Sequence, residues 1–379
     1  MSKRANGEGN IRQRPNGKWE GRITYLDPAT DKRRSVSVYA DTATACRREL
    51  KKVRDRLDQG QPAKDSPDTV AAWMGRWRES SLAASSRKAT TKEQYSNLSR
   101  KHLEAEPFGA LRLDKLKPSH VEELIVALRA KGLADSSVRS CYTVLRQGLD
   151  VAVRDGLIAA NPAAKVKRPT VARKETEYLS AADVAKLLEA SKGLRYHLAV
   201  LVMAATGLRR GEVAGLTWSA VDLDRGELAV LRTVARIKSG LIVDDVKTER
   251  SRRRVPLPPR LVAALKAHRK TQLEERLHAG DQWCDTGAVF ATEFGGYLDP
   301  RNLLRTVEIA AKKAGIGKAG AHTMRHSAAT AWLESGVHIK AVSDLLGHSS
   351  IAVTADVYGH TSDDTARAAV ADLAKALGV

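Results

Sequence analysis

Apolar and polar residues alternate along the first forty positions of the chain. Trp19, Ile23 and Tyr25 alternate with charged or hydroxylated residues, a turn-forming segment covers 27–32, and a second alternating run covers 34–39. A period of two predicts strands of a small antiparallel sheet. Further along, apolar residues recur at helical spacing, at Cys46, Leu50, Val53 and Leu57. The pattern therefore predicts a three-stranded sheet covered by one helix.

A second segment carries helical periodicity throughout. It follows residues 60–68, a run of glycine, proline and polar residues that is typical of a linker. Apolar stripes occupy one face of 70–77 and of 136–149, and Pro162 ends the last helix. These stripes predict a small all-helical domain.

The third segment mixes helices with three short stretches of strand character. Ser180 is placed to cap a helix at its N-terminus, whereas 226–234, 240–248 and 252–258 alternate or are bounded by turn residues. The three stretches predict a three-stranded patch in a mostly helical domain.

A last apolar stripe predicts a short tail helix that packs on its own domain or on a neighbouring protomer. Its members are Ala366, Val370, Leu373 and Leu377. The chain is thus expected to be a multidomain α+β protein with domains at 1–60, 67–165 and 172–379.

Basic residues outnumber acidic ones in each of these segments. The 379 residues include 64 Lys and Arg against 44 Asp and Glu, a net charge of +20 with a pI near 9.9. Basic charge spread over folded segments favours binding to a polyanion, most often nucleic acid, with a heparin-like polymer or a membrane surface as the alternative. The candidate DNA contacts, which would otherwise be solvated surface residues, are Arg12, Arg14, Arg22, Arg34, Arg139 and Arg146.

Other features narrow the class of protein. No stretch is apolar for the roughly 18 residues that a membrane helix needs, and "MSKRANGEGN" lacks the apolar core of a signal peptide. We therefore expect a cytosolic protein. Cys46, Cys141 and Cys284 are widely spaced and odd in number, so we expect reduced packing residues and neither a disulfide framework nor a zinc ribbon.

Four fragments of the third segment place cationic and polar residues between apolar runs. In "ATGLRRGEVAGLTW", Arg209 begins an element and Glu212 follows one helical turn later. Because the helix macrodipole disfavours a cation there, an anion should face Arg209; a simple ion pair that fastens the helix start explains the pattern equally well. In "DDVKTERSRRRVPL", Lys247 stands at a strand end, where a lysine is usually just solvated.

The third fragment, "GAHTMRHSAATAWLESG", places His322 and Arg325 three residues apart at a helix start, hence on one face. Together they present several hydrogen-bond donors in one direction, as an oxyanion or phosphate requires. A metal cluster is the competing interpretation, opposed by the lack of a carboxylate at ligand spacing and by the charge of the arginine. Its histidines would be His322, His326, His348 and His360.

The fourth fragment, "LLGHSSIAVTADVYGHTS", sets His348 and Tyr358 on either side of a polar turn. A tyrosine in isolation is most often a half-buried core residue. Beside arginines, histidines and a lysine, and without paired carboxylates, it suits a site that binds a phosphate and attacks it without a metal.

"TGLRRGE", "VKTERSRRRVPL", "HTMRHSAAT" and "LGHSSIAVTADVYGH" resemble, in order and spacing, the active-site motifs of the tyrosine recombinase (phage integrase) family. Glu212 matches the acidic residue that often follows the first arginine, and Met324 stands where the family usually has leucine. The family's catalytic pattern falls on Arg209, Lys247, His322, Arg325, His348 and Tyr358.

The resemblance implies a role for each matched residue. Tyr358 would attack the scissile phosphate and form a 3′-phosphotyrosyl bond, while Arg209 and Arg325, helped by His348, would hold the non-bridging oxygens. Lys247 would protonate the departing 5′ oxygen. His322 would assist proton transfer and phosphate binding. The family requires no metal or nucleotide cofactor.

The resemblance also implies partners and a biological setting. Residues 67–165 resemble the helical core-binding domain and 1–60 an arm-binding domain, which recombinases of the Xer type generally lack. We therefore expect an integrase that integrates and excises a phage or mobile element, acting as a tetramer on core and arm attachment sites in a prokaryotic cytoplasm, at the nucleoid. Excisionase and a DNA-bending host factor are the expected accessory proteins. A resolvase or transposon recombinase of the same chemistry, or a catalytically vestigial DNA-binding regulator, is the alternative.

Overall fold

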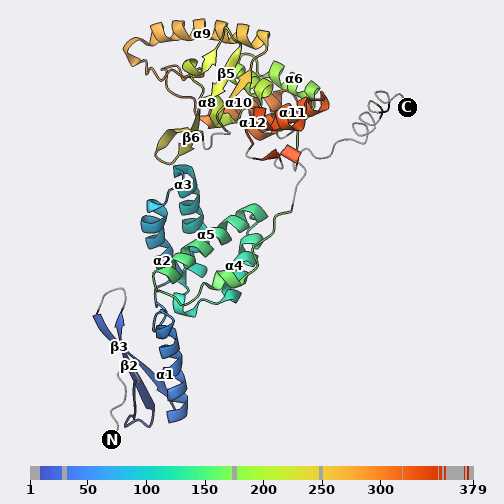
Figure 1. Ribbon diagram of the computed structural model, residues 1–379. Helices are drawn as coiled ribbons and strands as arrows, with labels where there is room; N and C mark the ends of the chain where they lie inside the picture. The colour runs from blue at the N-terminus through green and yellow to red at the C-terminus, as the bar shows by residue number, and fades with distance from the viewer. Residues whose placement is uncertain are drawn as a thin grey trace. The chain divides into compact units, whose positions relative to one another are not determined.

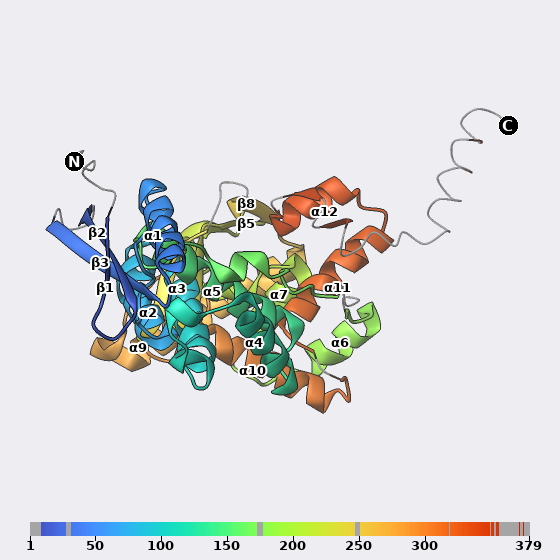
Figure 2. The same cartoon turned by 90° about the horizontal axis from the view of Figure 1, so that it is seen from below.

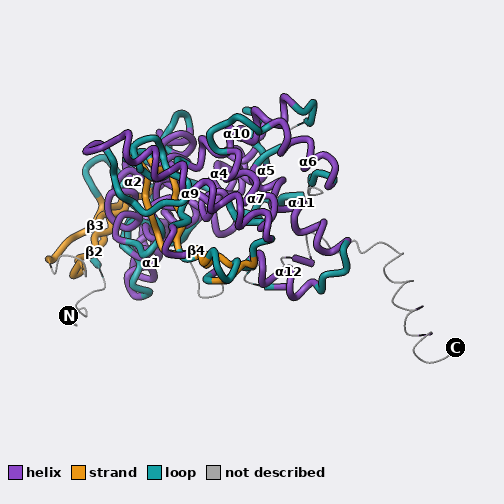
Figure 3. Tube along the Cα trace, turned by 90° about the horizontal axis from the view of Figure 1, so that it is seen from above, coloured by secondary structure: helices purple, strands orange, loops and turns teal. Residues whose placement is uncertain are grey.

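The computed structural model describes residues 9–27, 32–172, 177–246, 251–317, 319–348, 350–351, 354–355, 371 and 374. The chain divides into two compact units, Met1–Ala172 and Arg173–Val379 (Figure 1). Most of the chain is helix and loop, and strands form a smaller part of it (Figure 2 and Figure 3). A three-stranded sheet near the N-terminus, many helices and further small antiparallel sheets confirm the predicted multidomain α+β class.

The first unit begins with an antiparallel sheet in the order β1–β2–β3, formed by Asn10–Gln13, Trp19–Asp27 and Lys32–Ala40. Helix α1 (Ala43–Asp58) packs against one face of this sheet (Figure 1). The close approach of α1 to β2 explains why residue 21 is a glycine, because a Cβ at Gly21 would lie 3.0 Å from the Sγ of Cys46. The predicted sheet and helix are therefore both present.

The rest of the first unit is helical, with α2 (Val70–Trp77), α3 (Ala89–Leu98), α4 (Pro118–Ala130) and α5 (Asp135–Arg154). Its core is separate from that of the sheet module. The indole Nε1 of Trp73 donates to the carbonyl of Gly148, 2.9 Å away, which joins α2 to α5. The buried side chains of this core include Trp73, Met74, Trp77, Val121, Leu124, Leu145 and Leu149.

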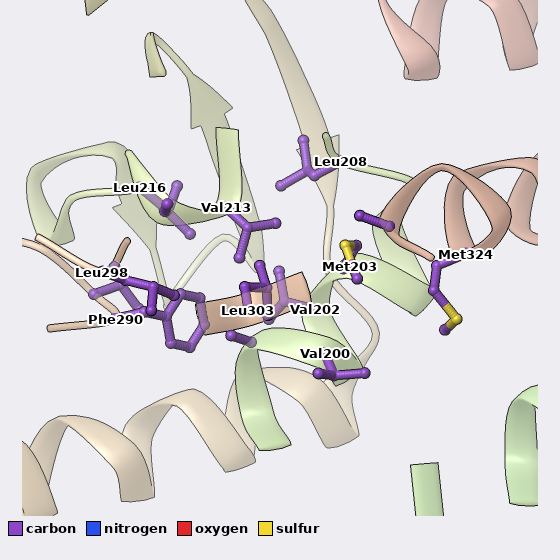
Figure 4. Close-up of a cluster of buried hydrophobic side chains, with 14 of the residues drawn as sticks. Val200, Val202, Met203, Leu208, Val213, Leu216, Phe290, Leu298, Leu303 and Met324 are labelled. Atoms are coloured by element: carbon purple, nitrogen blue, oxygen red, sulfur yellow. The ribbon is translucent and has the colours of Figure 1, made fainter. Parts of the chain in front are cut away.

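The second unit surrounds one large apolar core with helices and two small sheets. The helices are α6 (Ala181–Ala190), α7 (His197–Thr206), α8 (Arg210–Ala214), α9 (Pro259–Ala279), α10 (Pro300–Lys313), α11 (Ala321–Glu334) and α12 (Ile339–Leu346). Val200, Val202 and Met203 of α7 lie in the core with Leu303 of α10 and Met324 of α11 (Figure 4). Ser180 caps α6 as predicted, its hydroxyl accepting from the backbone N of Asp183.

The strands of the second unit differ from the predicted three-stranded patch. The stretch 226–234 divides at Leu231 into two strands that belong to different sheets. One sheet contains β4 (Val221–Asp222), β5 (Glu227–Val230) and β8 (Arg253–Pro256), and the other is a hairpin of β6 (Arg232–Ile237) and β7 (Gly240–Asp245). The prediction of one patch was wrong because no glycine or proline marks the break.

Two further expectations can be compared with the structure. All three cysteines are free thiols; Cys46 and Cys141 are buried packing residues, whereas Cys284 is exposed, so its predicted packing role was wrong. In the described part of the chain, no helix combines the length and the apolar character needed to cross a membrane.

Candidate active site

Arg209 lies at the N-terminus of α8, immediately after the turn that ends α7. Gly207 makes this turn in the left-handed conformation, with φ at 61°. The carboxylate of Glu212 accepts from the Arg209 backbone N at 3.0 Å and from its Nη1 at 2.8 Å. The predicted ion pair is therefore present. The Arg209 side chain remains 39% exposed, so it is still accessible to a ligand.

A second arginine reaches the same carboxylate from the sheet. Arg253, the first residue of β8, donates from Nη2 to Oε2 of Glu212 at 2.8 Å. Burial opposes ionisation of Glu212, but the hydrogen bond and charge of Arg253 and the charge of Arg209 outweigh it and lower the pKa of this carboxyl group. Glu212 is therefore an ionised carboxylate buried between two cations.

Arg325 of α11 joins the ends of two other helices. It is 4% exposed, and its Nη1 donates to the carbonyl of Gly207 at 2.9 Å while Nη2 donates to that of Leu346 at 2.7 Å. Gly207 precedes Arg209 by two residues, and Leu346 precedes His348 by two. One buried guanidinium thus brings together the segments that carry two predicted site residues.

His348 lies just beyond α12, which ends at Gly347 in the left-handed conformation. Its Nδ1 lies 2.8 Å from the hydroxyl of Thr354, which is fully buried. Burial and the charges of Arg325 and Arg209 lower the pKa of His348 to about 4, so the ring is neutral at pH 7. When Thr354 donates to Nδ1, Nε2 carries the proton and can donate to a ligand oxygen.

The two histidines of α11 experience the same positive environment. Burial and the charges of Arg210, Arg325 and Arg209 lower the pKa of His322. Burial and the charges of His322 and Arg325 lower that of His326. The site therefore carries an excess of positive charge that an anion, and a phosphodiester in particular, would neutralise.

Several candidates fall outside the described residues. Lys247, Tyr358 and His360 lie there, and the same is true of the predicted tail stripe. Within the described ranges, no group of three or more His, Cys, Asp or Glu side chains is arranged to share a metal ion.

Three of the four predicted DNA contacts of the sheet module lie on the face opposite α1. Arg12 and Arg14 each donate from Nε to Oε2 of Glu20, at 2.9 and 2.8 Å, and Arg22 donates to the hydroxyl of Ser35 at 2.7 Å. Arg34 is paired with Tyr25 across the two strands, and the ring of Tyr25 packs in the core under α1. The side chain of Arg34 therefore lies on the face that α1 covers.

The two candidates of the helical core are placed differently from each other. Arg139 of α5 donates from Nε to the carbonyl of Pro169 at 3.0 Å, so it holds the chain that leaves the helical core. Arg146, on the same helix, is exposed. Both positions lie in the first unit, before Arg209 and the other residues of the predicted catalytic set.

Sequence reasoning missed three residues of these sites: Glu20, Arg253 and Thr354. Glu20 is 4% exposed although it lies on the outer face of a sheet, and only the positions of its arginine partners explain this. Arg253 is the middle residue of three consecutive arginines, which offer no signal that one of them is buried. Thr354 lies within "IAVTADVY", where its apolar neighbours were a weak sign of burial.

Comparison with known proteins is consistent with this geometry. Residues 177–365 match the model of the phage integrase family. A "Tyrosine recombinase XerC-like" protein of Caldanaerobacter subterraneus subsp. tengcongensis is 33% identical over 293 residues, which cover 73% of this chain and 75% of that protein. An "Integrase" of Streptomyces ambofaciens is 31% identical over 336 residues, 84% of this chain and 82% of that protein.

Solved structures share the fold. A Tn1549 transposon Integrase in complex with a circular intermediate DNA has a TM-score of 0.67 at 23% identity and covers 81% of this chain and 99% of that chain. A lambda integrase tetramer bound to a Holliday junction has a TM-score of 0.56 at 20% identity, with 95% and 99% coverage. The chain therefore belongs to the tyrosine recombinase (phage integrase) family, whose members cut and rejoin DNA at specific sites.

Proposed function

We propose that this recombinase is an integrase that cuts DNA through a 3′-phosphotyrosyl intermediate and so integrates and excises a phage or other mobile element. The observation that carries the chemistry is the convergence of Arg209, Arg325 and His348. Arg325 fastens the segments of the other two through the carbonyls of Gly207 and Leu346. Donors held in place before the substrate arrives stabilise the charge that develops on a phosphate during its attack.

Each residue of the set has a defined task in this proposal. Arg209 and Arg325 bind the non-bridging oxygens of the scissile phosphate, and neutral His348 donates a hydrogen bond to one of them through Nε2. His322 assists phosphate binding and proton transfer; burial and the charges of the nearby arginines lower its pKa, which favours the neutral ring that can accept a proton.

Two further residues complete the reaction. Tyr358 is the nucleophile: its phenolic proton passes to His322, its oxygen forms a bond to phosphorus as the bond to the 5′ oxygen breaks, and Lys247 gives that 5′ oxygen a proton. The attack of a DNA hydroxyl on the phosphotyrosine then reverses the bond changes and releases the tyrosine.

The assignment as an integrase rests on how far the resemblance extends. The match to the Integrase of Streptomyces ambofaciens spans more of this chain than the match to the XerC-like protein, 84% against 73%. The additional length is compatible with an arm-binding module at 1–60, before a core-binding domain at 67–165 and a catalytic domain at 172–379.

We further propose the assembly and its setting. A homotetramer would bind core and arm sites of double-stranded DNA, with excisionase and a DNA-bending host factor as accessory proteins, at the nucleoid of a prokaryotic cytoplasm. The strongly basic composition, with a net charge of +20, favours such extended contact with DNA.

A covalent trap tests the chemistry without knowledge of the attachment site. The full chain is incubated with host genomic fragments that carry sparse nicks, so that a short cleaved strand diffuses away and rejoining fails. DNA that remains bound to protein after detergent denaturation is sequenced. The wild-type chain should yield covalent DNA enriched in one sequence, and Tyr358→Phe should yield none.

Tyr178→Phe is the matched control, because Tyr178 is another tyrosine of the second unit and is 52% exposed. It should trap DNA as the wild-type chain does. An unchanged covalent yield from Tyr358→Phe would exclude Tyr358 as the nucleophile. A wild-type chain that binds DNA but never becomes covalently attached would favour the vestigial regulator instead.

A further inference from the structure

Arg253 holds two parts of the proposed active site at once, although it belongs to neither. We propose that Arg253 is a positioning residue for strand cleavage: its guanidinium fixes Glu212, and with it Arg209, and also fixes the end of α12, and with it His348. This inference rests on the proposed function, because it assigns Arg209 and His348 to the phosphate.

The first connection is a two-point contact with Glu212. Nη2 donates to Oε2 at 2.8 Å, and Nη1 lies 3.4 Å from Oε1, which also accepts from Nη1 of Arg209 at 2.8 Å. The Arg253 side chain is 6% exposed and that of Glu212 is 5% exposed. Since both are shielded from water, removing either partner would leave a buried charge unpaired, which costs far more than the loss of a surface ion pair.

The second connection reaches the C-terminus of α12. Nε of Arg253 donates to the carbonyl of Leu345 at 2.6 Å, and the next carbonyl, that of Leu346, accepts from Arg325. Carbonyls in the last turn of a helix lack partners within the helix and carry partial negative charge, so cations bind there favourably. Two arginines therefore fix the last turn of the helix that precedes His348.

Gly347 shows how tightly this arrangement is packed. A Cβ at this position would lie 3.0 Å from Nη1 of Arg253 and 3.1 Å from its Cδ. The residue also has a φ of 66°, which disfavours any side chain. The chain can turn from α12 to His348 beside the guanidinium only because glycine occupies this position.

The register of β8 explains why Arg253, and not a neighbour, has this position. Arg253 pairs with buried Val230 on β5, so its side chain points to the core-facing side of the sheet. Arg254 pairs with Ala229, points the other way, and forms an ion pair with Glu227 at the surface.

The geometry favours positioning over direct contact with DNA. All three guanidinium nitrogens of Arg253 donate to protein acceptors: Glu212, the carbonyl of Leu345 and that of Ser251. A lysine keeps the charge but has one nitrogen, which cannot bind Glu212 and Leu345 in the directions that the planar fork allows. Arg253→Lys is therefore the informative substitution.

The experiment uses the full chain and, as probe, a nicked duplex of the sequence recovered in the covalent trap. We expect Arg253→Lys to cut about 100-fold more slowly than the wild-type chain, because small displacements of catalytic groups are costly. Its affinity for the duplex should change by less than about threefold, with an unchanged salt dependence, since no phosphate contact is lost. The neighbouring control, Arg254→Lys, should cut at nearly the wild-type rate.

A second variant covers the case in which Arg253→Lys does not fold. Gly347→Ala keeps Arg253 but places a methyl group against its guanidinium, so cleavage should again be slow. In the double variant Gly347→Ala with Arg253→Ala, the strain of a side chain at φ 66° remains, but the part of the loss that comes from contact with the Arg253 side chain should disappear. Additive losses would show that the two positions act independently and would contradict the inference.

Other results overturn the inference directly. Wild-type cleavage by Arg253→Lys would remove the positioning role. A loss of affinity as large as the loss of rate, with a shallower salt dependence, would mean that Arg253 contacts DNA itself.

If the wild-type chain traps no DNA, the proposed function fails and the positioning geometry is tested by hydrogen exchange. Arg253→Lys should then speed amide exchange in both α8 and residues 343–348, whereas Arg254→Lys should not. Faster exchange in neither segment would overturn the inference on its own.

Discussion

Two carboxylates of this chain, Glu20 and Glu212, are each buried between two arginines, yet the two clusters are built differently. Glu20 holds Arg12 and Arg14, whose side chains are 61% and 41% exposed and which lie within eight residues of it. Glu212 holds Arg209, three residues away, and Arg253, which is 41 residues away and almost fully buried.

The surroundings of the two carboxylates differ as well. Hydrogen bonds from Arg14 and Arg12 lower the pKa of Glu20 to about 2, and the residues 9–27 and 32–60 around it contain no histidine. Around Glu212, burial and the charges of Arg325 and Arg209 lower the pKa of both His322 and His348.

The two clusters use the contact between a carboxylate and an arginine in two different ways. A carboxylate that holds exposed arginines in a fixed direction on a sheet face presents donors to a ligand and contributes little to the joining of distant elements. A carboxylate that holds a buried arginine joins a helix to a strand. The cost of burying the two charges is offset only when the hydrogen-bond geometry between the partners is close to ideal. The first arrangement suits recognition, and the second suits the rigid support of a reaction site.

The largest effect that separates the clusters should come from Glu212→Gln. The neutral amide leaves Arg253 buried without its counter-charge, so the free energy of local opening should fall by about 3 kcal/mol. Amide hydrogen exchange of α8 and β8 in the full chain measures this loss. The control is Glu227→Gln, whose partner Arg254 is 68% exposed, and it should cost under about 1 kcal/mol. Equal losses in the two variants would mean that the burial of Arg253 adds nothing to its contact with Glu212, which would remove the difference drawn between the two clusters.

Acidification should weaken the two clusters at different pH values. His348 has a pKa of about 4 in the fold and an ordinary value of 6.5, so the unfolded state binds the proton more readily. Stability in the second unit should therefore fall as pH drops from 6.5 toward 4, by on the order of 1 kcal/mol at pH 5. Glu20, depressed from 4.5 to about 2, contributes stability that is lost only below 4.5.

Hydrogen exchange at pH 7 and pH 5, corrected for the intrinsic exchange rate, tests this order. Protection of α12 should decrease while that of β2 stays constant. His348→Gln should remove part of the decrease; His322 and His326, whose pKa values are also lowered, account for the rest. Protection of β2 that decreased over the same interval would show that the sheet depends on another titrating group.

Periodicity and motif order predicted a good part of the sheet module around Glu20 and of the site around Glu212. Alternation located β2 and β3, helical spacing located α1, and the motifs placed Arg209, Arg325 and His348 in segments that the structure brings together. These patterns are local, and each depends on residue type at a fixed spacing.

Register was not predictable in the same way. A shift of one residue turns every side chain of a strand to the other face, and runs such as Arg33–Arg34 or Arg252–Arg254 look alike in either register. The pairing of Arg253 with Val230 and of Arg34 with Tyr25 depends on how two strands align, which the pattern of neither strand determines by itself. Buried partners such as Glu20 could not be identified without that pairing.

The smallest effect concerns the exposed arginines of the sheet module. If Arg14 contacts a phosphate, Arg14→Gln should reduce the slope of log affinity against log salt by about 0.9, and thereby weaken binding roughly eightfold at 0.1 M salt. Titration of the full chain with a mixed-sequence duplex at several salt concentrations measures the slope. Arg48→Gln is the matched control, because Arg48 is a 73% exposed arginine on α1 rather than on the outer sheet face. The same slope for Arg14→Gln and the wild-type chain would mean that Glu20 holds its arginines for the stability of the sheet. The two clusters would then have the same structural role. A reduced slope that Arg48→Gln does not share would assign the outer face to DNA.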